Sequence, residues 1–188
     1  MLKELVQKSR SYRRFYQEEP ISLATLEELV DLARLTPSAA NKQPLKYLLI
    51  NTPEKNEAVF QCLAWAGYLK DWDGPTEGEK PAGYIVMLGD KDISVSYNFD
   101  NGIAAQTIML GAVERGLGGC MIVSIKREKL AQALAIPNTY EILIVLALGK
   151  PKEKVILQDI SPSGDVKYWR DAQGNHYVPK RPLREIIL

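Results

Sequence analysis

The sequence predicts a single domain of the α+β class, in which helices and strands are mixed along the 188 residues. Two observations support this fold class. Segments with apolar residues at helical spacing alternate with short apolar runs that have the length of buried strands. In addition, residues 99–115 are apolar around most of a helical circumference, which is typical of a helix enclosed by a core. A chain of this length can bury such a core without a second domain.

The first half of the chain is expected to contain three helices and one strand. Residues 2–9 have the pattern of a short amphipathic helix. Residues 22–34 predict a second helix, because the serine at its start is a good N-cap and apolar residues recur on one face. Residues 45–50 indicate a mostly buried strand. Residues 52–68 predict a third helix, since Thr-Pro-Glu at their start combines a cap, a proline at N1 and an acid in the first turn.

The second half is expected to alternate strands and helices up to residue 148, where a Gly-Lys-Pro sequence follows. Glycine 116 has the position of a C′ residue for the enclosed helix. The expected elements are a polar loop at 70–81, strands at 84–88, 119–123 and 140–148, the enclosed helix at 99–115, and a helix at 124–135 capped by Ser124.

Residues 150–188 differ in character from the rest of the chain, because basic residues outnumber acidic ones and the segment ends in Ile186-Ile187-Leu188. An apolar terminus is costly to leave in water. We therefore expect an arm that crosses the domain or a neighbouring subunit and docks at its end.

Counts of reactive side chains exclude several kinds of chemistry. The one histidine, His176, and two separated cysteines cannot supply a zinc cage, so no metal site is expected. His176 lies in a polar turn and is expected to be solvated, and no Gly-x-Ser-x-Gly elbow accompanies it. Glycine-rich phosphate loops are also missing from the sequence. The chemistry must therefore come mainly from a bound cofactor.

Composition also limits the partners and the location. A net charge of +1 argues against a nucleic-acid binder, and the longest apolar runs are too short to span a membrane. The N-terminus lacks the pattern of a secretory signal. Cys62 and Cys120 have apolar surroundings, which fits buried thiols in a reducing compartment. We expect a cytoplasmic protein without a nucleic-acid or membrane partner.

Two basic clusters are candidate anion sites. The first is the run Arg10-Ser11-Tyr12-Arg13-Arg14, whose guanidinium groups and hydroxyl could hold a phosphate. The second is Lys180-Arg181, which lies between two prolines that fix the backbone. The alternatives are a solvated face for the first cluster and a solubilising tail for the second.

The loop at residues 37–44, Pro-Ser-Ala-Ala-Asn-Lys-Gln-Pro, is a candidate for contact with a flat ligand. Its small side chains allow a ligand to approach the backbone, and its two amides both donate and accept hydrogen bonds. The alternative is an ordinary connection between a helix and a strand.

These motifs, in this order, resemble the nitroreductase family of FMN-dependent oxidoreductases, and the resemblance covers nearly the whole chain. The specificity of the resemblance comes from five motifs that occur together and in this order. The matched motifs are Arg-Ser-x-Arg-x-Phe (Arg10, Ser11, Arg13, Phe15), Pro-Ser-Ala-x-Asn-x-Gln-Pro (37–44), Gly-Leu-Gly after the buried helix (116–118) with a strand behind it, Gly-x-Pro (149–151) and Arg-Pro (Arg181, Pro182).

The resemblance implies a three-layer α/β/α fold with a mostly antiparallel central sheet around a long buried helix. It implies one nitroreductase-like domain over residues 1–188 and a homodimer with FMN at the interface. Residues 150–188 would form an extended arm that crosses to the partner subunit.

The resemblance also implies roles for individual residues. Arg10, Ser11 and Arg181 would hold the FMN phosphate, and Arg13 would lie near the pyrimidine edge of the ring. The family pattern is not kept at Ser9, where many relatives carry a basic residue, and this leaves Arg10 and Arg14 as alternatives at the phosphate. The residues expected to line the flavin are Pro37, Ser38, Ala39, Asn41 and Gln43, from one or both subunits, and Met121, Ile122 and Val123 at a strand end.

The activity that the resemblance implies is transfer of electrons from NADH or NADPH, through FMN, to a small conjugated acceptor in a ping-pong mechanism. Arg13 would act catalytically by stabilising negative charge on the reduced ring. Tyr68, Lys70 and Trp72 are candidates for the pocket wall. The alternatives are a specialised member such as a reductive dehalogenase, and a flavin store or redox sensor without efficient turnover.

Overall fold

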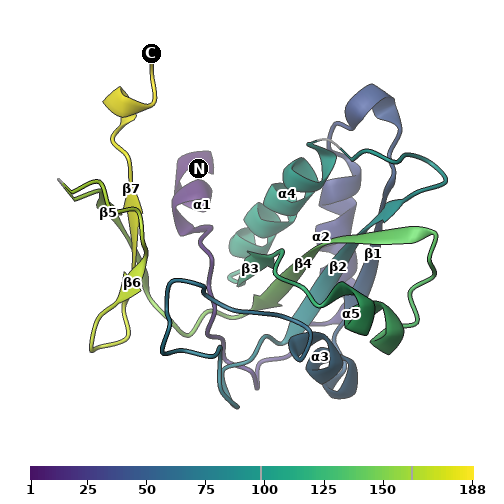
Figure 1. The fold of residues 1–188 in the computed structure, drawn as a ribbon, viewed down its shortest axis with the longest axis horizontal. Coiled ribbons are helices and arrows are strands. Elements are labelled where there is room, and N and C mark those ends of the chain that lie inside the picture. Colours follow the sequence, from purple (N-terminus) through teal and green to yellow (C-terminus); the bar gives the residue numbers. More distant parts are fainter. Residues whose placement is uncertain (98, 162) are drawn as a thin grey trace.

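The computed structural model describes residues 1–97, 99–161 and 163–188, and it is organised around a four-stranded antiparallel sheet (Figure 1). The strand order is β1-β2-β4-β3, so the strands nearest the centre are β2 and β4. Every residue of β2 is buried, as expected for a central strand. The antiparallel central sheet is therefore confirmed. Its strands are β1 (Leu45–Ile50), β2 (Gly83–Asp90), β3 (Gly118–Ile122) and β4 (Tyr140–Gly149).

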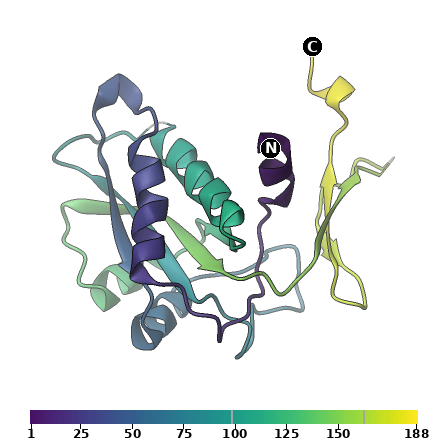
Figure 2. The ribbon, with the colours of Figure 1, turned by 180° about the vertical axis from the view of Figure 1, so that it is seen from behind.

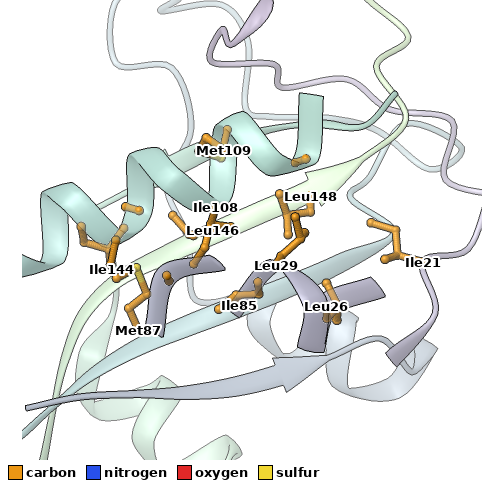
Figure 3. Packing of buried hydrophobic residues seen from close by; sticks show 14 of the residues in the cluster. Ile21, Leu26, Leu29, Ile85, Met87, Ile108, Met109, Ile144, Leu146 and Leu148 are labelled. Carbon is orange, nitrogen blue, oxygen red and sulfur yellow. The ribbon is translucent and has the colours of Figure 1, made fainter. Parts of the chain in front are cut away.

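Helices cover both faces of this sheet and give it three layers. One face carries α2 (Leu23–Arg34) and α4 (Asp100–Glu114), and the other carries α3 (Pro53–Phe60) and α5 (Arg127–Ala133). Figure 3 shows the first core, where Leu29 of α2 and Ile108 of α4 meet Ile85 of β2. The neighbouring Tyr84 belongs to the second core, because successive strand residues point to opposite faces. The α+β fold is confirmed.

The long helix α4 is enclosed on most of its sides, as its composition predicts. Ala104, Ala105 and Ile108 are at most 1% exposed. One face stays uncovered, since Phe99 before the helix is 81% exposed and Ile103 is 39% exposed. The N-terminal half of α4 therefore presents apolar surface to solvent in a single chain.

Two helix boundaries differ from the sequence prediction. The helix α3 ends at Phe60 rather than near Tyr68, because the following chain pairs with the segment before α5. There the Ala64 N–H donates to the Ser124 carbonyl at 3.0 Å. Ser124 is consequently not a helix cap, and α5 begins at Arg127.

The N-terminal helix α1 (Leu2–Lys8) is followed by an extended segment, residues 9–15, that runs along β3. The Tyr12 N–H donates to the Gly119 carbonyl at 2.9 Å. A Cβ at Gly118 would lie 2.5 Å from the Tyr12 ring, and a Cβ at Gly119 would lie 2.4 Å from the Ala147 carbonyl oxygen. Gly118 is required because the segment approaches β3 so closely, and Gly119 because the backbone of β4 does.

Residues 150–188 form the expected arm, but it contains a small sheet that the sequence did not predict. The sheet has the order β5-β7-β6, and it stands beside α1, away from the larger sheet (Figures 1 and 2). Its elements are β5 (Val155–Asp159), β6 (Trp169–Arg170), β7 (His176–Lys180) and a 3-10 turn, η2 (Leu183–Glu185).

The end of the arm makes no apolar contact that buries it. Ile186 and Ile187 are 63% and 64% exposed. The arm thus does not dock at its end on its own domain, and its crossing to a partner stays a prediction. Within the described residues, no helix combines the length and the apolar character that a bilayer span requires.

Candidate functional site

The extended N-terminal segment and the strand β7 of the arm enclose a cavity of about 290 Å³, which we call the basic hollow. It brings together three residues that the sequence singled out at the first basic cluster, Arg10, Ser11 and Arg13. Its lining residues are Ser9, Arg10, Ser11, Arg13, Gln106, Met109, Met121, Tyr168, His176, Val178 and Lys180.

Strand periodicity decides which basic residue of the arm enters the hollow. Successive side chains of a strand alternate between its two faces, so His176, Val178 and Lys180 share one face of β7. Arg181 follows the strand and does not line the hollow; its guanidinium lies 3.4 Å from the Glu185 carboxylate. Lys180 of the arm therefore lines the basic hollow in this chain, and Arg181, which the resemblance assigned to the phosphate, does not.

The basic hollow has a net positive lining. Among the described residues, Arg10, Arg13 and Lys180 form no salt bridge, and the buried Nε of Arg10 has no hydrogen-bond partner. Arg10 donates instead to the Val6 carbonyl at 2.6 Å. Burial lowers the pKa of the Arg10 guanidinium, but it stays charged at neutral pH. Uncompensated cations around one cavity are the arrangement that attracts an anion.

Arg13 is fixed by contacts from the arm. Its backbone N–H donates to the buried carboxylate of Glu153, which also accepts from Arg170 at 2.8 Å. Its guanidinium carbon lies 4.7 Å from the centre of the Tyr168 ring. Its Nη1 lies 3.2 Å from Nε2 of His176. The side chain is thus clamped between the N-terminal segment and the arm.

His176 is not the solvated side chain that the polar turn suggested. It is 1% exposed, because it is the first residue of β7 and its side chain points into the hollow, while the turn before it is closed by Asp171. Burial, together with the nearby charges of Arg13 and Arg170, lowers the pKa of His176 to about 4. The imidazole is therefore neutral at physiological pH.

A second cavity of about 220 Å³, which we call the aromatic hollow, adjoins the first. Both are lined by Arg13, Met121 and Tyr168. The predicted strand-end residues lie here together. The lining consists of Arg13, Ala64, Trp65, Ala66, Gly67, Cys120, Met121, Ile122, Val123, Ser124 and Tyr168.

The aromatic wall comes from residues that the sequence reading missed. Trp65 lines the hollow because α3 ends early and the chain turns at Ala66, which has a φ of 40°. Tyr68 and Trp72, the expected wall residues, contact the arm instead. The Tyr68 ring lies 4.9 Å from the Tyr168 ring, and the Arg170 guanidinium lies 4.6 Å from the Trp72 ring. Both cysteines are buried and free, as expected.

Arg14 lies outside both hollows. Its guanidinium forms a two-bond ion pair with Glu79, and its Nε donates to Oε2 at 2.7 Å. Of the two alternatives that the sequence left open for an anion contact, the structure brings only Arg10 into the basic hollow.

The small-residue loop forms a separate site. Pro37, Ser38 and Gln43 line a third cavity of about 290 Å³, which shares no lining residue with the other two hollows. The Asp100 carboxylate at the start of α4 accepts from the Ser38 hydroxyl and from the Ala39 N–H.

This loop has an unusual backbone. Ala40, Asn41 and Gln43 have φ angles of 50°, 54° and 53°, a left-handed conformation that is uncommon outside glycine. Such strain persists only where the surroundings enforce it, and it is frequent at ligand sites. Within one chain, however, this loop does not meet the residues around Arg13.

Comparisons with known proteins agree with this architecture. The model of the Nitroreductase family matches residues 6–150. A proposed NADH dehydrogenase/NAD(P)H nitroreductase of Archaeoglobus fulgidus is 25% identical over 150 residues, which cover 75% of this chain and 80% of that protein.

Solved structures share the fold. A nitroreductase family protein of Streptococcus pneumoniae TIGR4 superposes with a TM-score of 0.72 at 16% identity, over 100% of this chain and 99% of the other. An FMN-dependent nitroreductase of Clostridium difficile R20291 superposes with a TM-score of 0.66 at 24% identity, over 80% of this chain and 87% of the other.

Proposed function

Because this chain belongs to the nitroreductase family, as its motifs predicted, we propose that it is an FMN-dependent oxidoreductase that uses NADH or NADPH. The acceptor would be a small conjugated molecule such as a nitroaromatic compound or a quinone. The observation that carries this proposal is the basic hollow, where three cations without carboxylate partners surround one cavity next to an aromatic one.

The basic hollow fits the phosphate of FMN. Guanidinium and ammonium groups bind phosphate oxygens through charge-assisted hydrogen bonds, and Arg10 and Lys180 supply one of each to the lining of this cavity. The buried, unpartnered Nε of Arg10 is a donor that an anion would satisfy. Ser11 lines the same wall. We assign these three residues to the phosphate.

The aromatic hollow fits a flat ring. Trp65 and Tyr168 supply aromatic walls, and the strand-end residues Met121–Val123 supply an apolar edge. Flat heteroaromatic ligands are usually held by such walls with a few polar groups that fix their orientation. We assign the strand end and the aromatic walls to the ring.

Arg13 lines both hollows, so its guanidinium stands where the ring would meet the charged part of the site. When bound, FMN would take up electrons from the nicotinamide and pass them to the acceptor. The fixed positive charge of Arg13 would stabilise the negative charge that the ring gains, and a preorganised group does so without reorganisation. The chain's own contribution is therefore orientation and charge.

The loop at residues 37–43 completes the site only in a homodimer. It lines a separate cavity in one chain, so we propose that Ser38, Asn41 and Gln43 of a second copy approach the ring. The exposed end of the arm and the uncovered face of α4 supply apolar surface for such an assembly.

The test begins with the visible spectrum of the purified protein and identification of any extracted flavin. We expect bound FMN that NADH or NADPH bleaches without oxygen and that a quinone restores. A yellow protein that neither nicotinamide bleaches would indicate a flavin store or sensor instead. A colourless protein that takes up no added FMN would refute the proposal.

Substitutions in the arm test the phosphate assignment. Lys180→Ala should weaken FMN binding at least tenfold, because loss of one charge-assisted hydrogen bond costs about 1.5–3 kcal/mol. Arg181→Ala is the matched control and should change the FMN dissociation constant by less than about threefold, since its side chain faces Glu185. If Arg181→Ala weakened FMN binding more than Lys180→Ala, Arg181 rather than Lys180 would contact the phosphate.

A further inference from the structure

We propose that His176 is a positioning residue for Arg13: its neutral imidazole accepts a hydrogen bond from the guanidinium and holds that positive charge at the ring site. The inference rests on the proposed function, because it concerns the charge that acts on bound FMN. It adds a role for the one histidine of the chain, to which neither the family motifs nor the proposed chemistry assigns a function.

The geometry fixes the direction of this hydrogen bond. Nη1 of Arg13 lies 3.2 Å from Nε2 of His176. A guanidinium can only donate, so Nε2 is the acceptor and the proton of the neutral ring lies on Nδ1. Among the described residues, the buried Nδ1 has no hydrogen-bond partner. The bond to Arg13 is thus the polar contact that orients the imidazole, and the two side chains orient each other.

Tyr168 supports both partners. Its ring lies 4.7 Å from the Arg13 guanidinium carbon and 5.2 Å from the imidazole, so it packs against the two groups that form the hydrogen bond. All three residues line the basic hollow. Arg13 and His176 are 9% and 1% exposed, respectively, which keeps water from competing for the bond.

A neutral acceptor orients the Arg13 guanidinium without reducing its positive charge. A carboxylate beside Arg13 would orient the guanidinium but would also cancel its charge. Glu153 is close, yet its two oxygens are taken by the backbone N–H of Arg13 and by Arg170. Nη1 of Arg13 also donates to the Ser11 carbonyl at 3.2 Å. His176 and this backbone carbonyl, both uncharged, therefore hold the guanidinium and leave its charge available to a ligand.

The surroundings keep the imidazole neutral. The cations that face it are Arg13 from the N-terminal segment and Arg170 from β6, and Lys180 lines the same hollow from its own strand. Glu153 is the nearby acid, and it is neutralised by Arg170. A proton on Nε2 would place two positive charges 3.2 Å apart and would break the bond.

The first experiment needs no flavin. Because the chain has one histidine, protein labelled with ¹⁵N-histidine gives one set of imidazole NMR signals. We expect a neutral ring protonated on Nδ1 and no titration between about pH 8 and pH 5.5. In Arg13→Gln the pKa should rise but stay below about 6.5, the value of a free histidine, because burial, the largest cause of its lowering, remains. A wild-type ring that titrates near that value, or one protonated on Nε2, would overturn the inference.

The second experiment uses the FMN-loaded protein and compares two substitutions of the same residue. His176→Phe keeps a ring against Tyr168 but removes the acceptor, whereas His176→Gln can keep an acceptor near Nε2. We expect His176→Phe to reduce the preference for reduced over oxidised FMN by about fivefold, which is typical of one lost hydrogen bond, and so to make the midpoint potential more negative. The midpoint potential of FMN bound to His176→Gln should stay near that of the wild type.

A control on the other face of the strand separates positioning from damage to the arm. Tyr177→Phe removes a hydroxyl that bonds Asp171 outside the hollow, and it should leave the potential unchanged. If His176→Phe binds FMN with the wild-type potential, or if His176→Gln shifts it equally, the inference fails while the proposed function stands. If wild-type protein binds no FMN, the proposed function fails. Should His176→Phe not fold, His176→Gln and the NMR titration of Arg13→Gln decide.

Discussion

Truncation of Glu153 should destabilise the protein strongly, because this carboxylate joins the arm to the N-terminal segment. Its side chain is fully buried and binds both the Arg13 N–H and the guanidinium of Arg170, whose side chain is 15% exposed. In Glu153→Ala, a nearly buried cation and a backbone donor lose their acceptor. Breaking a buried pair in this way costs about 3–5 kcal/mol. We expect the lower end, about 3 kcal/mol, because Arg170 also packs on Trp72 and can turn towards water.

Urea unfolding followed by circular dichroism measures this loss, and trypsin digestion shows whether the arm opens first. Glu153→Gln should lose less, since an amide still accepts a hydrogen bond. Glu185→Ala is the control on the same arm, because it removes an exposed ion pair with Arg181 worth at most about 1 kcal/mol. If Glu153→Ala and Glu185→Ala were equally stable, the buried carboxylate would not hold the arm to the domain.

Three further outcomes are expected. The pKa of His176 is about 4 in the folded protein and about 6.5 in the unfolded chain. Between these pH values the unfolded chain binds a proton that the folded protein does not. The free energy of unfolding should therefore fall as the pH falls from about 6.5 to about 4. His176 contributes at most about 3 kcal/mol to this pH-dependent loss of stability. Urea unfolding at several pH values should show a smaller pH-dependent loss in His176→Gln than in the wild type. Gly119→Ala should cost about 1–3 kcal/mol in thermal unfolding, because its Cβ would lie 2.4 Å from a carbonyl oxygen of β4. Gly102→Ala, with open space around its Cβ in α4, should be neutral or stabilising. Deletion of Ile186–Leu188 should shift the protein towards monomer in sedimentation experiments, and an unchanged dimer would exclude these residues from the interface.

Local patterns predicted most of the central domain. The Ser22 cap is present, and its hydroxyl accepts from the Thr25 N–H. The four strands of the larger sheet lie where apolar runs indicated them. Burial on both faces gives β2 and most of β4 a continuous apolar signal, whereas in the edge strand β1, which was expected to be mostly buried, only Ile50 is buried. The end of α3 was missed since it depends on pairing between residues 63 and 125, which no local window contains.

The candidate site was predicted only in part, for the same reason. Arg10, Ser11 and Arg13 could be found because basic residues cluster within a few positions. The strands of the arm are short and polar, so their periodicity was not recognised. The position of Lys180 in the basic hollow was therefore not predicted. His176 was misread because a polar turn surrounds it in sequence, whereas β7 turns its side chain inward.

The amino-acid order alone determined the motifs that identify the family and the presence of basic residues near both ends of the chain, since composition, spacing and motifs are local properties. The antiparallel core was expected only through the resemblance to that family. Tertiary structure decided which of those residues share a cavity, because strand pairing and alternation select one face of each segment. It also decided their protonation and orientation. A histidine becomes a neutral acceptor beside Arg13 only where folding removes it from water and surrounds it with positive charge.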